Sequence, residues 1–340
     1  ISMGKKVQEF EKLFCDYSNT KFAIAMNNGT STLHAIMMAL NIKPGDEVIL
    51  PSLSYISLAN VVLYQGGTPV LCDSDQRTFN VCKENIKLKI TNKTKAFVTV
   101  DMKGLPVDYK VFQELSKETG VPFISDSAES LGALYKGCPI GSQALAHSFS
   151  FFANKNVTTG EGGMIVTNNE KLYKKLLIIR NQGQEGRYNH TIIGNNFRMT
   201  DIQAAIGIEQ LKKIEKSIID KNFFAQRYNK ILSRISGVQI PFQPSYVDRH
   251  SWYLYSIMVN TKKRGSLVDF LTKNNIETRL SFPPVHIQPF YKNKYNFKPK
   301  DFPEAFTAYS KFIDIPIWSG MGENRQNLVI DNIKKYMSLI

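Results

Sequence analysis

The amino-acid sequence predicts an α/β fold built on a mostly parallel sheet, and two observations carry this prediction. From about residue 21 to residue 168, short β-branched or apolar runs alternate with helical patterns, as they do where crossover helices join parallel strands. The chain also has 340 residues, of which 43% are hydrophobic, so it is long enough to bury a sizeable core.

The predicted strands are short apolar runs bounded by turn residues, at Ala23–Met26, Glu47–Leu50, Thr68–Cys72, Ala96–Val100, Val121–Ser125 and Met164–Thr167. Between the first two lies TSTLHAIMMAL, in which Leu33, Ile36, Met37 and Leu40 recur at the spacing of one helix face. This segment is therefore predicted to be a helix packed on the sheet. Further helical periodicity predicts helices at 109–117, 171–180 and 201–211.

The character of the sequence changes after residue 230, where the Pro- and Ser-bearing stretch QIPFQPSY precedes an aromatic strand candidate, SWYLYSIMV. Helices are predicted near 267–274 and at 323–338. We therefore expect a large domain at 1–230 and a small C-terminal α+β domain at 231–340.

Composition narrows the classes of function. The formal charge of +14 suits either dispersed, solvated lysines or a phosphate-bearing ligand, because the basic residues are spread over the chain and form no stripe. The longest apolar runs are far shorter than the roughly 18 to 20 residues of a membrane span. The first residues, ISMGKKVQEFEKLF, lack the apolar region of a secretory signal. The four cysteines lack metal-ligand spacing, so we expect reduced thiols and no metal site.

The first candidate site segment is NNGTST, Asn27–Thr32, where a strand meets the start of the predicted helix. Free backbone N–H groups and the positive end of the helix dipole suit a phosphate there. Ordinary capping of the helix by Thr30 or Ser31 explains the same residues. The segment alone does not decide between the two interpretations.

The second segment is ISDSAES, Ile124–Ser130, which places Asp126 at the carboxyl end of an apolar strand. In parallel sheets ligands bind at that edge. The carboxylate can cap a following helix, or it can hold a positive charge on a ligand, such as a protonated pyridine nitrogen.

The third segment is the most specific: HSFSFFANKNVTTGEGGMIVT, His147–Thr167. Lys155 lies here between the hydroxyl of Ser150 and a Gly-rich turn that leads into another strand. A lysine desolvated in a site acts as nucleophile and base, which imine chemistry requires. The alternative is a solvated loop lysine.

These three segments in this order, with GDEVILPSLSYIS between the first two and IIGNNFRMTDIQAAIGIEQL after the third, resemble the DegT/DnrJ/StrS-type family of sugar aminotransferases. The likeness is strong from the first residues to about residue 211, and IETRLSFPPVHIQPFY, Ile276–Tyr291, extends it. The resemblance implies the type I, aspartate aminotransferase-like fold of pyridoxal-phosphate-dependent transferases. It also implies a homodimer with active sites shared between subunits.

The resemblance assigns roles to individual residues. Lys155 would hold pyridoxal 5′-phosphate as a Schiff base, and Asp126 would pair with the ring nitrogen. Tyr55 would stack on the ring, unless it is core packing, and Asn196 would reach the phosphate from the partner subunit. Glu129 is also expected to bind the cofactor, since it stands where many members carry a Gln or His that contacts the ring oxygen. DMKG, Asp101–Gly104, replaces the commoner HLYG, so Asp101 and Lys103 receive no role. The expected phosphate-binding residues are Gly29, Thr30, Ser31 and Ser150.

The same resemblance suggests the substrates. The segments SFFANK, TTGEGGM, QGQ and RYNH are most similar to enzymes that aminate C4 of a nucleotide-linked 4-keto-6-deoxyhexose, with L-glutamate as donor, to give viosamine or perosamine. This pathway implies a cytoplasmic protein. The expected substrate contacts are Arg187, Tyr188, His190, Arg279 and His286, each of which can instead be a surface or interface residue.

Other classes fit less well. A dinucleotide-dependent dehydrogenase requires a G-x-G-x-x-G turn, which NNGTST does not supply. A nucleic-acid-binding protein would show clustered basic residues with a recognition module. Amination at C3 or another position remains open, and so does a non-catalytic regulator that binds the same cofactor, although a regulator has no need of Lys155.

Overall fold

A computed structural model describes residues 1–339 of the chain. Its centre is a seven-stranded sheet with the order β1-β9-β8-β5-β4-β2-β3. All neighbouring pairs are parallel except the two made by β9, so the prediction of a mostly parallel sheet is confirmed. The strands are β1 (Phe22–Met26), β2 (Glu47–Pro51), β3 (Thr68–Cys72), β4 (Thr94–Val100), β5 (Phe123–Asp126), β8 (Ala146–Ser150) and β9 (Gly163–Thr167).

The sheet is buried on both faces, which explains why its strands are nearly continuous apolar runs. Alternate residues of β1 show this: Ile24 and Met26 join one hydrophobic cluster, and Ala23 and Ala25 join the other. The helices of this part are α1 (Lys5–Ser18), α2 (Gly29–Ala39), α3 (Ser57–Tyr64), α4 (Lys83–Lys87), α5 (Tyr109–Thr119), α6 (Glu170–Arg180) and α7 (Asp201–Leu211). The predicted helices at 109–117, 171–180 and 201–211 are therefore confirmed.

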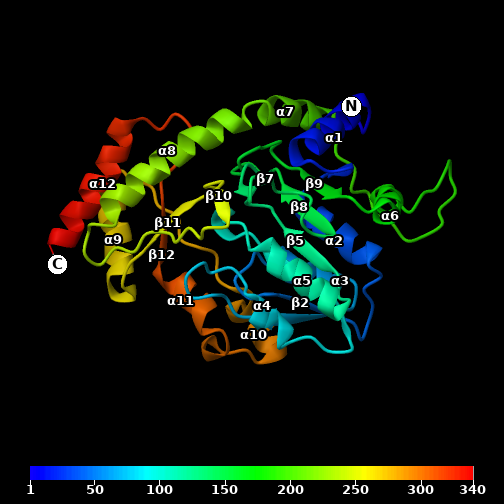
Figure 1. Cartoon of the computed structure of the whole chain (residues 1–340), viewed down its shortest axis with the longest axis horizontal. Helices are drawn as coiled ribbons and strands as arrows, with labels where there is room; N and C mark the ends of the chain where they lie inside the picture. Colours follow the sequence, from blue (N-terminus) through cyan, green and yellow to red (C-terminus); the bar gives the residue numbers. More distant parts are fainter. Residues whose placement is uncertain (340) are drawn as a thin grey trace.

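The long helix α8 (Ile214–Leu232) leads from α7 across the molecule to the C-terminal elements (Figure 1). There α9 (Thr261–Lys273) and α12 (Glu323–Ser338) pack with a two-stranded sheet of β11 (Tyr255–Met258) and β12 (Phe312–Ile315) around a third hydrophobic cluster. The remaining elements are α10 (Pro289–Tyr295), α11 (Pro303–Lys311) and a small sheet of β6 (Leu134–Tyr135), β7 (Cys138–Pro139) and β10 (Val247–Arg249).

The division into domains at residue 230 stays a prediction. The third cluster takes members from Phe224 to Tyr336, close to the predicted C-terminal domain. However, Val285, Tyr291, Phe302 and Phe312 pack into the cluster on one face of the large sheet. The C-terminal part of the chain therefore contacts the large sheet extensively.

The N-cap of helix α2 lies two residues before Thr30, the earlier of the two predicted caps. Asn28 is the N-cap, and its side-chain oxygen accepts a hydrogen bond from the backbone N–H of Ser31. The prediction that Thr30 or Ser31 caps the helix is therefore wrong. The hydroxyls of these two residues are available to a ligand. Among residues 1–339, no helix combines the length and the apolar composition of a membrane span.

Candidate active site

A cavity of about 510 Å³ lies at the carboxyl ends of the parallel strands. Strands β5 and β8 end at Asp126 and Ser150, and α2 begins just after the end of β1, so all three elements bring residues to one edge of the sheet. The cavity brings together most of the predicted site residues: Gly29, Thr30, Ser31, Tyr55, Asp126, Glu129, Ser150, Lys155 and Arg279.

The start of α2 forms the cradle predicted for a phosphate. Gly29 is required there, because a Cβ on this residue would lie 2.8 Å from the Cβ of Ser150. This close approach brings the Ser150 hydroxyl beside the N–H groups of the first helical turn, which have no partner within the helix. The donor set of backbone N–H groups and the hydroxyls of Thr30, Ser31 and Ser150 therefore fits a phosphate.

Asp126 is buried and lines the same cavity as the cradle. Burial raises the pKa of its carboxyl to about 7, although a hydrogen bond from the Ala128 N–H at 3.1 Å and the charge of Lys155 oppose this shift. A buried carboxylate in this situation is stabilised by a cation placed in the cavity. The site therefore fits a cofactor that carries a protonated ring nitrogen.

The raised pKa predicts an unusual pH dependence of stability for the cofactor-free protein. Because folded Asp126 keeps a proton that the unfolded chain loses near pH 4, its contribution to stability falls as the pH rises from about 4 to about 7. Asp126→Asn removes this loss of stability. The free energy of unfolding of the variant should therefore exceed that of the wild type by up to about 4 kcal/mol near pH 8. Urea unfolding of both proteins near pH 5 and near pH 8 measures the difference.

The matched control for this prediction is Asp16→Asn, which changes an exposed carboxylate. Its difference from the wild type should be small at both pH values. Asp101, whose pKa burial raises to about 6, adds its own slope in the same direction but remains in both proteins. An equal difference between Asp126→Asn and wild type at the two pH values would contradict the assignment.

Lys155 lies on the loop that joins β8 to the antiparallel β9. Its ammonium is 3.7 Å from a carboxylate oxygen of Glu129 and 4.1 Å from the centre of the Tyr253 ring. The side chain is only 13% exposed, so the alternative of a solvated loop lysine is wrong. Asn156 anchors the loop by donating to the carbonyls of Leu131 and Ser251.

The structure adds site residues that sequence reasoning missed, and Tyr253 is the most important. Its ring covers Lys155, and its hydroxyl donates to Asn154 Oδ1 at 3.1 Å and accepts from Arg279 at 3.3 Å. The only sequence signal was its place in the aromatic strand candidate SWYLYSIMV. Tyr55 is not core packing, because its ring is 59% exposed and meets Phe282 edge-on.

The remaining predicted residues lie elsewhere. Arg187, Tyr188, His190 and Asn196 belong to the long loop between α6 and α7, which extends from the body of the molecule (Figure 1). All four are exposed, and none lines the cavity as residues 1–339 form it. Their roles in binding a ligand therefore stay predictions.

His286, which was predicted to contact the substrate, does not line the cavity as residues 1–339 form it, and this role stays a prediction. The residue is buried, its Nδ1 lies 2.6 Å from the Ser52 hydroxyl, and its ring packs against Phe302. Burial also lowers the pKa of His286 to about 4, so it would not present a cation to a diphosphate at neutral pH.

The comparisons with known proteins agree with this geometry. The model of the DegT/DnrJ/EryC1/StrS aminotransferase family matches residues 1–334, so the chain belongs to that family. It is a sugar aminotransferase with the predicted fold, and its substrates are a sugar and an amino donor.

Three similar proteins illustrate the relationship. The GDP-perosamine synthase of Escherichia coli O157:H7 is 37% identical over 99% of this chain and 92% of its own length. The GDP-perosamine synthase of Caulobacter vibrioides is 41% identical over 85% of this chain and 80% of its own length. The PLP form of Spr1654 from Streptococcus pneumoniae matches with a TM-score of 0.94 and 28% identity, over 100% of this chain and 92% of that structure.

Proposed function

We propose that this protein transfers the amino group of L-glutamate, with pyridoxal 5′-phosphate as cofactor, to C4 of a nucleotide-linked 4-keto-6-deoxyhexose. One observation carries the proposal: Lys155, flanked by Glu129, shares a cavity with buried Asp126 and the start of α2. The product would be a 4-amino-4,6-dideoxy sugar nucleotide of the viosamine or perosamine type. The likeness to two GDP-perosamine synthases supports C4 as the position.

The residues present suit the cofactor. Gly29, Thr30, Ser31 and Ser150 would hold its phosphate, Asp126 its ring nitrogen, and Tyr55 one face of its ring. When bound, pyridoxal phosphate supplies an electron-accepting ring that stabilises negative charge on the reacting carbon.

The chain itself supplies binding and proton transfer. Within residues 1–339, Lys155 is the lysine that lines this cavity, and its amine lies beside both a carboxylate and an aromatic face. It would therefore attach the cofactor and, once released, move the proton between the two reacting carbons. Glu129 holds that ammonium by charge, and the Tyr253 ring shields it from water. Asp126 would stabilise a proton on the ring nitrogen.

Substrate recognition would centre on Arg279. It lines the cavity and donates to the Tyr253 hydroxyl at 3.3 Å, which orients the guanidinium beside Lys155. Arginine is suited to paired hydrogen bonds with a phosphate or a carboxylate. Arg279 therefore either meets the diphosphate of the sugar nucleotide or the carboxylate of glutamate.

Substitution of Arg279 distinguishes these two ligands. Arg279→Ala should raise the KM of the ligand it contacts by about tenfold or more, since a hydrogen bond to a charged group is lost. The KM of the other ligand should change little. Steady-state kinetics with each substrate varied in turn measures this, with Arg187→Ala as a comparison from the exposed loop. Unchanged KM values for both would remove Arg279 from the substrate contacts.

We also infer that the enzyme is a homodimer with shared sites. The loop between α6 and α7 exposes Ile193 and Tyr188 at 86% and 79%, and α7 exposes Ile202 and Ile206 one turn apart. Such apolar side chains favour association with another subunit. Asn196 lies at the base of the same loop, where it would reach a partner's phosphate cradle.

The function is tested by supplying sugar nucleotides to the purified protein with glutamate. GDP-, UDP- and dTDP-linked 4-keto-6-deoxyhexoses should be compared with a 3-keto isomer, and the position of nitrogen in the product determined by nuclear magnetic resonance. Amination at C4 supports the proposal, and the sugar nucleotide that is accepted identifies the substrate. Amination at C3 alone corrects the position, and no amination of any of them contradicts it.

A further inference from the structure

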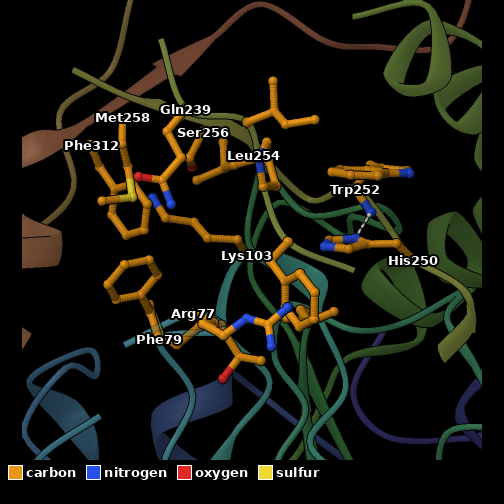
Figure 2. Close-up of a pocket in the computed structure, with 16 residues that line it drawn as sticks. Arg77, Phe79, Lys103, Gln239, His250, Trp252, Leu254, Ser256, Met258 and Phe312 are labelled. Carbon is orange, nitrogen blue, oxygen red and sulfur yellow. Dashed lines mark hydrogen bonds between the residues drawn. The ribbon is translucent and has the colours of Figure 1, made fainter. Parts of the chain in front are cut away.

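Lys103 occupies a central place in the molecule that the reaction described above does not use. It lies in the short 3₁₀ turn Met102–Gly104, directly after β4, within the DMKG segment. Figure 2 shows its side chain extended among side chains from distant parts of the sequence, including Phe79, Ser256, Met258 and Phe312. The turn separates this small second cavity from the cofactor cavity, since Met102 lines both.

The end of the Lys103 side chain is held by the C-terminal part of the protein. Its ammonium lies 2.8 and 2.9 Å from the two oxygens of Asp314 in β12 and 2.8 Å from the hydroxyl of Ser281. Asp314 is buried, with its side chain 2% exposed, and Lys103 is largely buried, with its side chain 12% exposed. Because buried charges are costly unless they are paired, this contact constrains both side chains tightly.

The backbone of Lys103 contacts Glu129, the carboxylate that faces the catalytic Lys155. The backbone N–H of Lys103 donates to Oε2 of Glu129 at 2.7 Å, and Oε1 of that carboxylate is 3.7 Å from the Lys155 ammonium. One Glu129 oxygen is thus fixed by the turn while the other faces the catalytic lysine. The direction of this N–H depends on the backbone of Lys103.

That backbone is in the left-handed region, with φ 59°, which is uncommon for a residue other than glycine, asparagine or aspartate. The turn is also pressed against the segment that carries Glu129. A Cβ on Gly104 would lie 2.9 Å from the Glu129 carbonyl oxygen and 2.1 Å from the Ser251 hydroxyl. The conformation is therefore maintained by its surroundings, which include the Asp314 ion pair and the hydrogen bond from the Met102 N–H to Asn80 Oδ1.

We propose that Lys103 is a positioning residue: its ion pair with Asp314 holds the turn so that the Lys103 N–H fixes Glu129 beside Lys155. This inference rests on the proposed function, because it concerns the efficiency of the step that Lys155 performs. It makes β12 in the C-terminal part of the chain a structural support of the catalytic lysine.

The test uses a double-mutant cycle with the cofactor-loaded enzyme. Lys103→Met/Asp314→Asn removes both charges and so leaves no unpaired buried charge. It should lower kcat about tenfold with little change in either KM. In a Glu129→Ala background, which has no side-chain acceptor for the Lys103 N–H, the same pair of substitutions should lower kcat less than about twofold. Lys87→Met/Glu118→Gln, which removes an exposed ion pair, is the matched control.

Equal losses of kcat in the two backgrounds would overturn the inference, because Lys103 would then act independently of Glu129. Asp314→Asn alone leaves the Lys103 ammonium without its charge partner, so its loss of kcat should be at least as large and should also vanish in the Glu129→Ala background. A wild-type enzyme that transfers no amine would instead contradict the proposed function.

Hydrogen exchange of the cofactor-free protein gives a readout that does not depend on activity. The amide of Lys103 is expected to exchange slowly in the wild type and faster in Lys103→Met/Asp314→Asn, because the bond to Glu129 is no longer held. A peptide from α12 serves as the internal reference. Unchanged exchange at residue 103 would show that the ion pair does not hold the turn, and would overturn the inference.

Discussion

Lys155→Ala is expected to abolish amine transfer while leaving the fold intact. The general acid–base part of its role alone is worth about 10²- to 10⁴-fold in rate, and the covalent attachment of the cofactor is lost as well. Lys155 is the lysine that lines the cavity within residues 1–339, so no other lysine stands ready to replace it. The measurement is kcat with glutamate and the keto sugar nucleotide, together with borohydride reduction and mass analysis to locate the labelled peptide.

The control is Lys174→Ala, which changes an exposed lysine paired with Glu170. It should keep full activity and the same labelled peptide. Added methylamine should restore part of the activity of Lys155→Ala, because a small amine can enter the space left by the side chain and move the proton. Full activity of Lys155→Ala, or a label on another lysine, would contradict the assignment.

Most of the fold was predictable because the central strands are apolar on both faces. Strand β8 was not predicted, because its sequence AHSFS looks too polar for a buried strand. The structure shows how the polar groups are satisfied. His147 contacts the Ser127 hydroxyl through Nδ1 and accepts two backbone N–H bonds at Nε2, and Ser148 bonds Thr32. These partners are distant in sequence, so local patterns do not reveal them.

The site was predictable to the extent that its residues end strands or begin a helix. Asp126 and Ser150 end parallel strands, and Gly29 begins α2, so topology alone brings them to one edge. Tyr253 and His286 depend instead on how the C-terminal part of the chain returns to the large sheet. The contact between His286 and Ser52 spans 234 positions, and no spacing rule indicates whether such a histidine faces the cavity or the core.

The role of Lys103 also depends on a contact between residues that are distant in the sequence. The DMKG segment departs from the family pattern, and the sequence offered no role for its lysine. The role becomes visible only when Asp314, 211 positions away, is placed beside it. Departures from a family pattern are therefore most informative once the structure shows which residues compensate for them.

Asn196→Asp is expected to inactivate the proposed homodimer and yet to be rescued by a partner chain that is itself inactive. If Asn196 reaches the partner's phosphate cradle, a carboxylate there repels the phosphate, and opposed like charges cost several kcal/mol. The loss should therefore exceed about a hundredfold in kcat/KM. Asn189→Asp, on the exposed part of the same loop, adds an equal charge away from the cradle and should change activity little.

Hybrid dimers then decide whether the sites are shared. A hybrid of Lys155→Ala and Asn196→Asp chains, purified through a different tag on each chain, combines both intact residues in one of its two sites. It should recover about half of the wild-type activity, since a symmetric dimer has two equivalent sites. If each site is built from one chain alone, the hybrid contains no intact site and stays inactive. Half of the wild-type activity thus indicates a shared site, and no activity indicates two independent sites. The experiment needs one accepted substrate but not the identity of the natural sugar.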